Sequence, residues 1–166
     1  MSCLRLINQL FYKTSQPLLH CVLLACALQA VSVQAQVDTQ KLDSRDGKPM
    51  APPAIDGAMN LSAEQVITLI LTTPDLLIID ARKRSEYIKG HIQGAVNLLN
   101  SQMDEATLQG YADSKASALL FYCNGPHCMR SSDAVQKAID WGYHNVFWFR
   151  GGWSEWSEKR LPVVND

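Results

Sequence analysis

Short apolar runs recur along the C-terminal two thirds of the chain. Three runs of four residues, at 76–79, 119–122 and 146–149, show no alternation between apolar and polar positions. A strand that is buried on both faces needs apolar side chains in both directions, so these runs predict interior strands of a parallel sheet. Two further segments, at 58–61 and 95–98, are apolar except for one asparagine each and predict further strands.

Two segments between the predicted strands have helical periodicity. A capping-box pattern at residues 62–65 predicts a helix that reaches Leu71. A second helix, capped by Ser131 or Ser132 and stopped by Gly142, would bury one apolar face. That face consists of Ala134, Val135, Ala138 and Ile139. Strands that alternate with helices predict an α/β fold with a mainly parallel sheet.

The first 35 residues follow a different pattern. A basic beginning precedes an apolar stretch at 18–28, and small residues come before Ala35. This pattern predicts a signal peptide over residues 1–35, cleaved after about Ala35, and export to the periplasm. The apolar stretch is shorter than the about 20 residues that a helix needs to span a bilayer, which argues against a membrane helix. An alternative is that Cys26 ends a lipobox-like sequence and anchors a lipoprotein.

Residues 36–57 separate the predicted signal from the first predicted strand. They are polar and contain three prolines, which remove backbone donors and favour extended conformations. The segment is therefore predicted to be a flexible linker, and residues 58–166 to be the globular domain. No stable membrane span is expected in the mature chain.

Composition narrows the classes of partner. The chain has 166 residues, 47% of them hydrophobic, which suits one globular domain. The first 35 residues hold two of the 15 basic residues and none of the 16 acidic ones, so the remainder has a net charge of −3. This balance argues against a nucleic-acid partner. The mature chain keeps two of the five cysteines, Cys123 and Cys128.

Both cysteines lie in one loop, between a predicted buried strand and a predicted helix. A thiol beside a helix N-terminus meets unpaired amides that favour the thiolate, so Cys123 is predicted to be a nucleophile. The competing interpretation is an inert buried cysteine. Gly125 allows the loop amides to form an anion-binding nest, and Arg130 suits an oxyanion. The predicted substrate-binding residues are Asn124, Gly125, His127, Cys128, Met129 and Arg130.

Several motifs carry a family resemblance. Within residues 77–97 an aspartate, an arginine, Glu-Tyr and Gly-His-Ile-x-Gly-Ala follow one another. Further motifs are Tyr122-Cys123, Gly142-Tyr143 and Gly151-Gly152-Trp153. Their order is similar to the signatures of rhodanese-like sulfurtransferases. The resemblance implies a rhodanese-like α/β fold, with a central, mainly parallel five-stranded sheet flanked by helices. It also implies that Cys123 accepts a sulfane sulfur as a persulfide.

The implied activity is that of a thiosulfate:cyanide sulfurtransferase-like enzyme. A donor such as thiosulfate, a polysulfide or a persulfide would give its sulfur to Cys123, and a thiol or cyanide would accept it. The expected partners are small sulfur anions and a thioredoxin-like or other thiol protein, and no cofactor or metal is expected. Six residues separate Cys123 from Arg130. This loop is longer than a typical rhodanese loop, which argues against a tight thiosulfate pocket.

Alternatives remain for this loop. Cys128 is either a resolving thiol that attacks a Cys123 persulfide, or a residue that packs the loop or forms a static disulfide with Cys123. Under the first interpretation, Cys123→Ser removes sulfur transfer and Cys128→Ser alters redox sensitivity. A periplasmic thiol redox or Cu(I)-handling protein is another class, since Cys123, His127, Cys128 and Met129 include soft ligands. A third class is a binding module that keeps the rhodanese fold but has no catalytic activity.

Residues in the first motif have supporting predictions. Asp80 ends a predicted strand below the cysteine loop and is expected to accept hydrogen bonds from the loop amides. Arg82 and Glu86 have the spacing of a helical ion pair. His91 is expected to be packed and hydrogen-bonded rather than catalytic. Gly151 and Gly152 predict a tight turn before a short helix.

Overall fold

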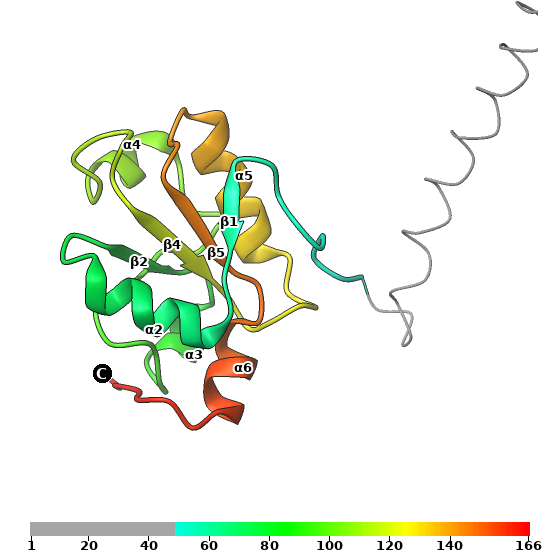
Figure 1. Cartoon of the computed structure of the whole chain (residues 1–166). Helices are drawn as coiled ribbons and strands as arrows, with labels where there is room; N and C mark the ends of the chain where they lie inside the picture. The colour runs from blue at the N-terminus through cyan, green and yellow to red at the C-terminus, as the bar shows by residue number, and fades with distance from the viewer. Residues whose placement is uncertain (1–48) are drawn as a thin grey trace, which may run out of the picture. The chain divides into compact units, whose positions relative to one another are not determined.

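The computed structural model describes residues 49–166, so the predicted signal peptide lies outside the described residues. Five parallel strands form one sheet in the order β1-β5-β4-β2-β3 (Figure 1). The strands are β1 (Ala58–Asn60), β2 (Leu77–Asp80), β3 (Ala95–Asn97), β4 (Leu119–Tyr122) and β5 (Val146–Phe149). The predicted five-stranded α/β fold is confirmed, and every predicted strand is present to within one residue at either end.

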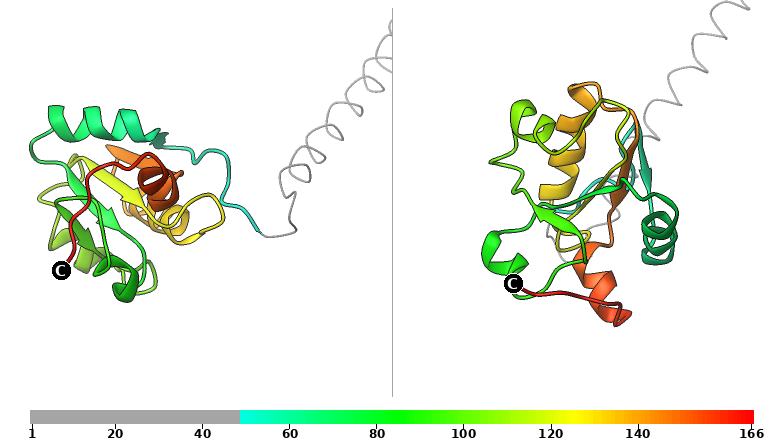
Figure 2. Two further views of the ribbon diagram at one scale, coloured as in Figure 1. Left: turned by 90° about the horizontal axis from the view of Figure 1, so that it is seen from below. Right: turned by 90° about the vertical axis from the view of Figure 1, so that its left-hand side faces the viewer.

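Helices cover both faces of the sheet (Figure 2). They are α2 (Ala63–Thr72), α3 (Arg84–Tyr87), α4 (Glu105–Gln109), α5 (Arg130–Asp140) and α6 (Gly152–Glu158). One apolar core includes residues of α4 and α5, and a second includes residues of α2, α3 and α6. Within residues 49–166, no helix is both long enough and apolar enough to cross a bilayer.

The central strand β4 shows why the apolar runs do not alternate. All four of its residues are buried. Leu119 and Phe121 belong to the core under α5, whereas Leu120 and Tyr122 belong to the core under α2 and α6. Because side chains of a strand point alternately to its two faces, the next residue, Cys123, falls on the α5 face.

The two predicted helix starts differ in outcome. The capping box of α2 is confirmed, since Gln65 N donates to Ser62 Oγ at 3.4 Å and Ser62 N donates to Gln65 Oε1 at 2.8 Å. The predicted cap of α5 is wrong, because α5 begins at Arg130, and Ser131 and Ser132 lie buried in its first turn. The hydroxyl of Ser131 is held by core partners instead of capping the helix.

The described end of the segment predicted as a linker is packed against the domain. Ala51 is buried, and its N–H donates to Pro126 O at 2.7 Å. Arg150, which follows β5, donates from Nε to Pro52 O at 2.8 Å and from Nη2 to Ala51 O at 2.9 Å. These bonds join the segment to the end of β5 and to the loop that carries the two cysteines.

Candidate active site

The loop between β4 and α5 lines a cavity at the carboxyl edge of the sheet, where ligands of open parallel sheets bind. The cavity has a volume of about 390 Å³. It is lined by all six predicted substrate-binding residues, together with Pro126 and Ser154: Asn124, Gly125, His127, Cys128, Met129 and Arg130. The sequence therefore identified the loop that surrounds this cavity.

The start of α6 holds the start of this loop. The N–H of Trp153 donates to Cys123 O at 2.8 Å, and the N–H of Ser154 donates to Asn124 O at 2.9 Å. Gly152 adopts φ +56°, and a Cβ there would lie 2.3 Å from Cys123 O. The close approach of these two backbones thus requires glycine at position 152.

Cys123 lies under the loop rather than in the cavity. The residue is 1% exposed and belongs to the core against α5. Its Sγ is 3.0 Å from Ser131 Oγ and donates to Cys128 O at 3.1 Å. Donation of the thiol proton to Cys128, together with burial, raises the pKa of Cys123, although the hydroxyl and the amide of Ser131 oppose this. These surroundings favour the neutral thiol.

Cys128 is half-buried and lines the cavity. Arg130 Nε donates to its Sγ at 3.2 Å. The neighbouring Cys123 thiol, the Arg130 guanidinium and the amide of Asn124 lower the pKa of Cys128, and burial opposes them. Both cysteines are free thiols. Arg130, which the sequence assigned to an oxyanion, thus donates to the Cys128 sulfur.

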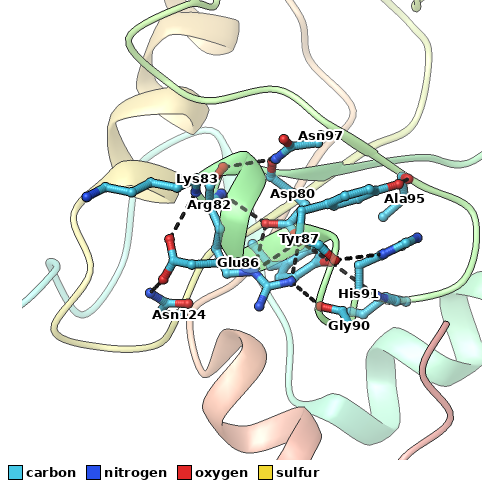
Figure 3. A network of polar contacts seen from close by, with 12 residues as sticks. Asp80, Arg82, Lys83, Glu86, Tyr87, Gly90, His91, Ala95, Asn97 and Asn124 are labelled. Atoms are coloured by element: carbon cyan, nitrogen blue, oxygen red, sulfur yellow. Dashed lines mark hydrogen bonds and ion pairs between the residues drawn. The ribbon is translucent and has the colours of Figure 1, made fainter. Parts of the chain in front are cut away.

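Glu86 of α3 ties Arg130 to the loop, and Figure 3 shows its contacts with Lys83 and Asn124. Its Oε2 accepts from Arg130 Nη1 at 3.0 Å and from Lys83 N at 3.0 Å, and its Oε1 accepts from Asn124 Nδ2 at 2.6 Å. Burial disfavours the ionised carboxylate, yet these bonds together lower the pKa of Glu86 to about 2. Sequence reasoning missed this role, because it paired Glu86 with Arg82 by helical spacing.

Arg82 pairs with Asp80 instead, so the predicted Arg82–Glu86 pair is wrong. Asp80 and Arg82 are 0% and 2% exposed, and Arg82 Nη2 lies 2.6 Å from Asp80 Oδ2. Tyr122 Oη also donates to that oxygen at 2.7 Å. Arg82 Nη2 donates to Gly90 O at 2.7 Å (Figure 3). Asp80 therefore binds these side chains, not the amides of the cysteine loop as predicted.

The two histidines of the motifs have different surroundings. His91 is buried, its ring stacks on that of Tyr87 at 3.7 Å between centroids, and its Nδ1 lies 3.1 Å from Tyr87 O. The prediction of a packed, hydrogen-bonded histidine is confirmed. His127 is exposed at the cavity. Among residues 49–166, no three His, Cys, Asp or Glu side chains gather as a metal site.

Comparison with known proteins places these motifs in one family. Residues 62–159 match the model of the rhodanese-like domain. The thiosulfate sulfurtransferase GlpE of Shewanella oneidensis is 31% identical over 99 residues, which cover 60% of this chain and 92% of GlpE. The uncharacterized protein YibN of Escherichia coli K12 is 29% identical over 98 residues, which cover 58% of this chain and 66% of YibN. The match thus spans slightly less than two thirds of YibN.

Solved structures share the fold. The thiosulfate sulfurtransferase of Pseudomonas aeruginosa superposes with a TM-score of 0.57 at 22% identity, over 65% of this chain and 20% of that one. The polysulfide-sulfur transferase of Wolinella succinogenes superposes with a TM-score of 0.53 at 17% identity, over 66% of this chain and 80% of that one. At these identities the likeness establishes the fold.

Proposed function

The chain belongs to the rhodanese-like domain family, and from this premise we propose that it is a sulfurtransferase. A cysteine of the β4–α5 loop takes a sulfane sulfur from thiosulfate, a polysulfide or a persulfide, and passes it to a thiol or to cyanide. The observation that carries the proposal is a thiol in contact with a guanidinium in one cavity, with Cys128 Sγ 3.2 Å from Arg130 Nε. This contact favours a thiolate, which is the nucleophilic form of cysteine.

The transfer proceeds in two steps. The thiolate attacks the outer sulfur of thiosulfate, the S–S bond breaks, and sulfite leaves with the electron pair. An acceptor thiolate or cyanide then attacks the outer sulfur of the persulfide and releases the cysteine thiolate. The sequence assigns this role to Cys123, and that assignment stays a prediction, since either thiol of the loop satisfies the proposed chemistry.

Intact mass measurement tests the proposal. The reduced full-length protein is measured before and after thiosulfate, and in parallel with inorganic polysulfide. We expect a gain of one sulfur atom, which cyanide removes as thiocyanate. The control is the double variant Cys123→Ser, Cys128→Ser, which gains no sulfur. A wild-type protein with two titratable thiols that gains no sulfur from either donor contradicts the proposal and favours a binding module.

Export is a separate proposal that rests on residues 1–35 alone. It bears on the chemistry, because an oxidising compartment favours disulfide formation between loop cysteines. Mass measurement of the N-terminus in fractionated cells tests it. We expect a periplasmic form that begins shortly after Ala35, whereas a lipidated Cys26 indicates the anchored alternative. An uncleaved protein in the cytoplasm contradicts both.

A further inference from the structure

A short segment before β1 packs on the outside of the cysteine loop. Residues 50–53, here called the strap, pass beside the turn at residues 125–128 (Figure 2). Ala51 is 2% exposed and shares the buried core that contains Cys123. Its N–H donates to Pro126 O at 2.7 Å. The family match begins at residue 62, so the strap lies outside the matched region and yet contacts the candidate active site.

Arg150 fastens the strap to the domain. It follows β5, is half-buried, and donates from Nε to Pro52 O at 2.8 Å and from Nη2 to Ala51 O at 2.9 Å. A guanidinium holds its donors in a rigid fork, so the two bonds fix the position and the direction of the strap. A further bond, from Asn60 Nδ2 to Pro53 O, is exposed and 3.3 Å long. Because bonds from a charged donor are the stronger ones, Arg150 is the main attachment.

The strap holds the turn that covers the Cys123 thiol. The N–H of Cys128 donates to Gly125 O at 2.9 Å, which closes residues 125–128 into one turn. Within this turn, Cys128 O accepts from the Cys123 thiol at 3.1 Å, and Pro126 O accepts from the strap. The closed turn moves as one unit. The strap that holds Pro126 O therefore also keeps Cys128 O on the Cys123 thiol.

Few other contacts restrain this turn. The first N–H groups of α6 hold the residues before it, since they donate to Cys123 O and Asn124 O at 2.8 and 2.9 Å. The turn itself has one further tie, from Arg130 Nε to Cys128 Sγ at 3.2 Å. An oxyanion that binds the Arg130 guanidinium competes with the sulfur for this donor, whereas it leaves the strap untouched. The strap is thus the tie that still closes the turn when an anionic donor arrives.

From these contacts we propose that the strap is a gate over Cys123 and that Arg150 is the positioning residue that latches it. The inference deepens the sulfur transfer proposed above and rests on it, with Cys123 as the residue that receives the sulfur. With the strap latched, Cys123 is 1% exposed and does not line the cavity. When the strap leaves, the turn lifts, Cys128 O withdraws from the thiol, and a donor reaches the Cys123 sulfur.

Alkylation that is resolved by cysteine tests the gate without a sulfur donor. The reduced full-length protein is treated with iodoacetamide, and mass spectrometry of fragments times the labelling of Cys123 and Cys128 separately. In Arg150→Ala we expect Cys123 to be labelled about tenfold faster than in the wild type, which corresponds to about 1.4 kcal/mol in the opening equilibrium. Cys128 already lines the cavity, so its rate should change little. Arg150→Lys keeps the charge but not the fork and should give an intermediate rate.

A variant of the strap tests the same contact from the other side. Ala51→Glu places a carboxylate at a buried position outside the family match, so it should expose Cys123 as Arg150→Ala does. Ala54→Glu, at an exposed position, is the matched control and should label at the wild-type rate. Gly142→Ala controls for lost stability, because its strain lies beyond the opposite end of α5. Wild-type labelling of Cys123 in both Arg150→Ala and Ala51→Glu overturns the gate, and so does equal acceleration in Gly142→Ala.

Sulfur transfer kinetics separate a failure of the gate from a failure of the proposed function. A gate limits the fraction of molecules that can bind the donor, so its release lowers the KM for thiosulfate and leaves kcat unchanged. With cyanide as the acceptor, we expect the KM of Arg150→Ala to fall by the factor by which its Cys123 labelling rises. A wild-type KM in that variant overturns the gate. Faster labelling of Cys123 in a protein that takes no sulfur from thiosulfate or polysulfide contradicts the proposed function alone.

Discussion

The chain leaves the same edge of the sheet after β2 and after β4, and an arginine paired with a carboxylate follows each strand. After β2, Arg82 is 2% exposed and its bonds go to Asp80 and Gly90 inside the protein. After β4, Arg130 is 23% exposed, pairs with Glu86 and reaches a cysteine sulfur at the cavity. The two arginines therefore differ in burial, since Arg82 holds the interior together whereas Arg130 faces a cavity.

The largest expected effect comes from breaking the buried pair. The Asp80 carboxylate is 0% exposed, and Arg82→Ala removes the cation that neutralises it. We therefore expect a loss of about 3–5 kcal/mol in the free energy of unfolding. The guanidinium also lies 4.3 Å from the centroid of the Trp153 ring, and this contact is lost too. Denaturant titration measures the change. A loss below about 1 kcal/mol, the range of exposed pairs, would contradict the comparison.

The two loops also differ in what fixes their backbones. Side chains fix the loop after β2, whereas the backbone of α6 approaches the loop after β4 through Gly152. Gly152→Ala puts an alanine into the left-handed backbone region, which costs about 1–2 kcal/mol. The new Cβ also collides with Cys123 O. We therefore expect a larger loss of unfolding free energy than that strain alone, with slower alkylation of Cys128.

Gly142→Ala is the matched control for this substitution. Gly142 also has a positive φ, +89°, but a Cβ there meets no neighbour within 4 Å. The free energy of unfolding of this variant should fall only by the conformational strain, about 1–2 kcal/mol, and the reactivity of Cys128 should stay unchanged. Equal losses in the two variants would show that the approach of α6 to the loop does not constrain it.

Patterning was sufficient to predict most of the fold. Runs of apolar residues predict β2, β4 and β5, because a strand buried on both faces has a composition that few other segments share. The edge strands β1 and β3 are less buried, but short segments at 58–61 and 95–98 predict them as well. The short helices α3 and α4 were not predicted, since four or five residues carry too little periodicity. The cap of α5 was wrong because Ser131 is used by core partners that are distant in sequence.

The candidate site was predicted as a set of residues but not as an arrangement. The sequence identifies the loop of Cys123 and Cys128, yet the direction of each side chain depends on the register of β4. A signal was available, because residues 119, 121 and 123 share one face of a buried strand. The link between Glu86 and Arg130 had no local signal, since the two residues are 44 positions apart in the sequence.

A smaller effect on stability, with a clear effect on reactivity, is expected at Arg130. The pair with Glu86 is partly exposed, so Arg130→Ala should change the free energy of unfolding by about 0–1 kcal/mol. Loss of the donor to the Cys128 sulfur should raise the pKa of that thiol, and labelling by iodoacetamide below this pKa slows about tenfold per unit of increase. Arg84→Ala, which removes an exposed ion pair, is the control. Unchanged labelling in Arg130→Ala would contradict the role of Arg130.

The smallest expected effect is an acid dependence of stability at Glu86. Its pKa falls from an ordinary 4.5 to about 2 on folding, so the stabilisation is complete above pH 4.5 and is lost as the pH falls toward 2. The unfolding midpoint of the wild type should therefore approach that of Glu86→Gln over this range. Glu64→Gln is the matched control, because the pKa of Glu64 is also lowered to about 2, but beside Lys159 on the surface. Salt should weaken the Glu64 effect more than the partly buried Glu86 effect, and equal salt sensitivity would contradict the distinction by burial.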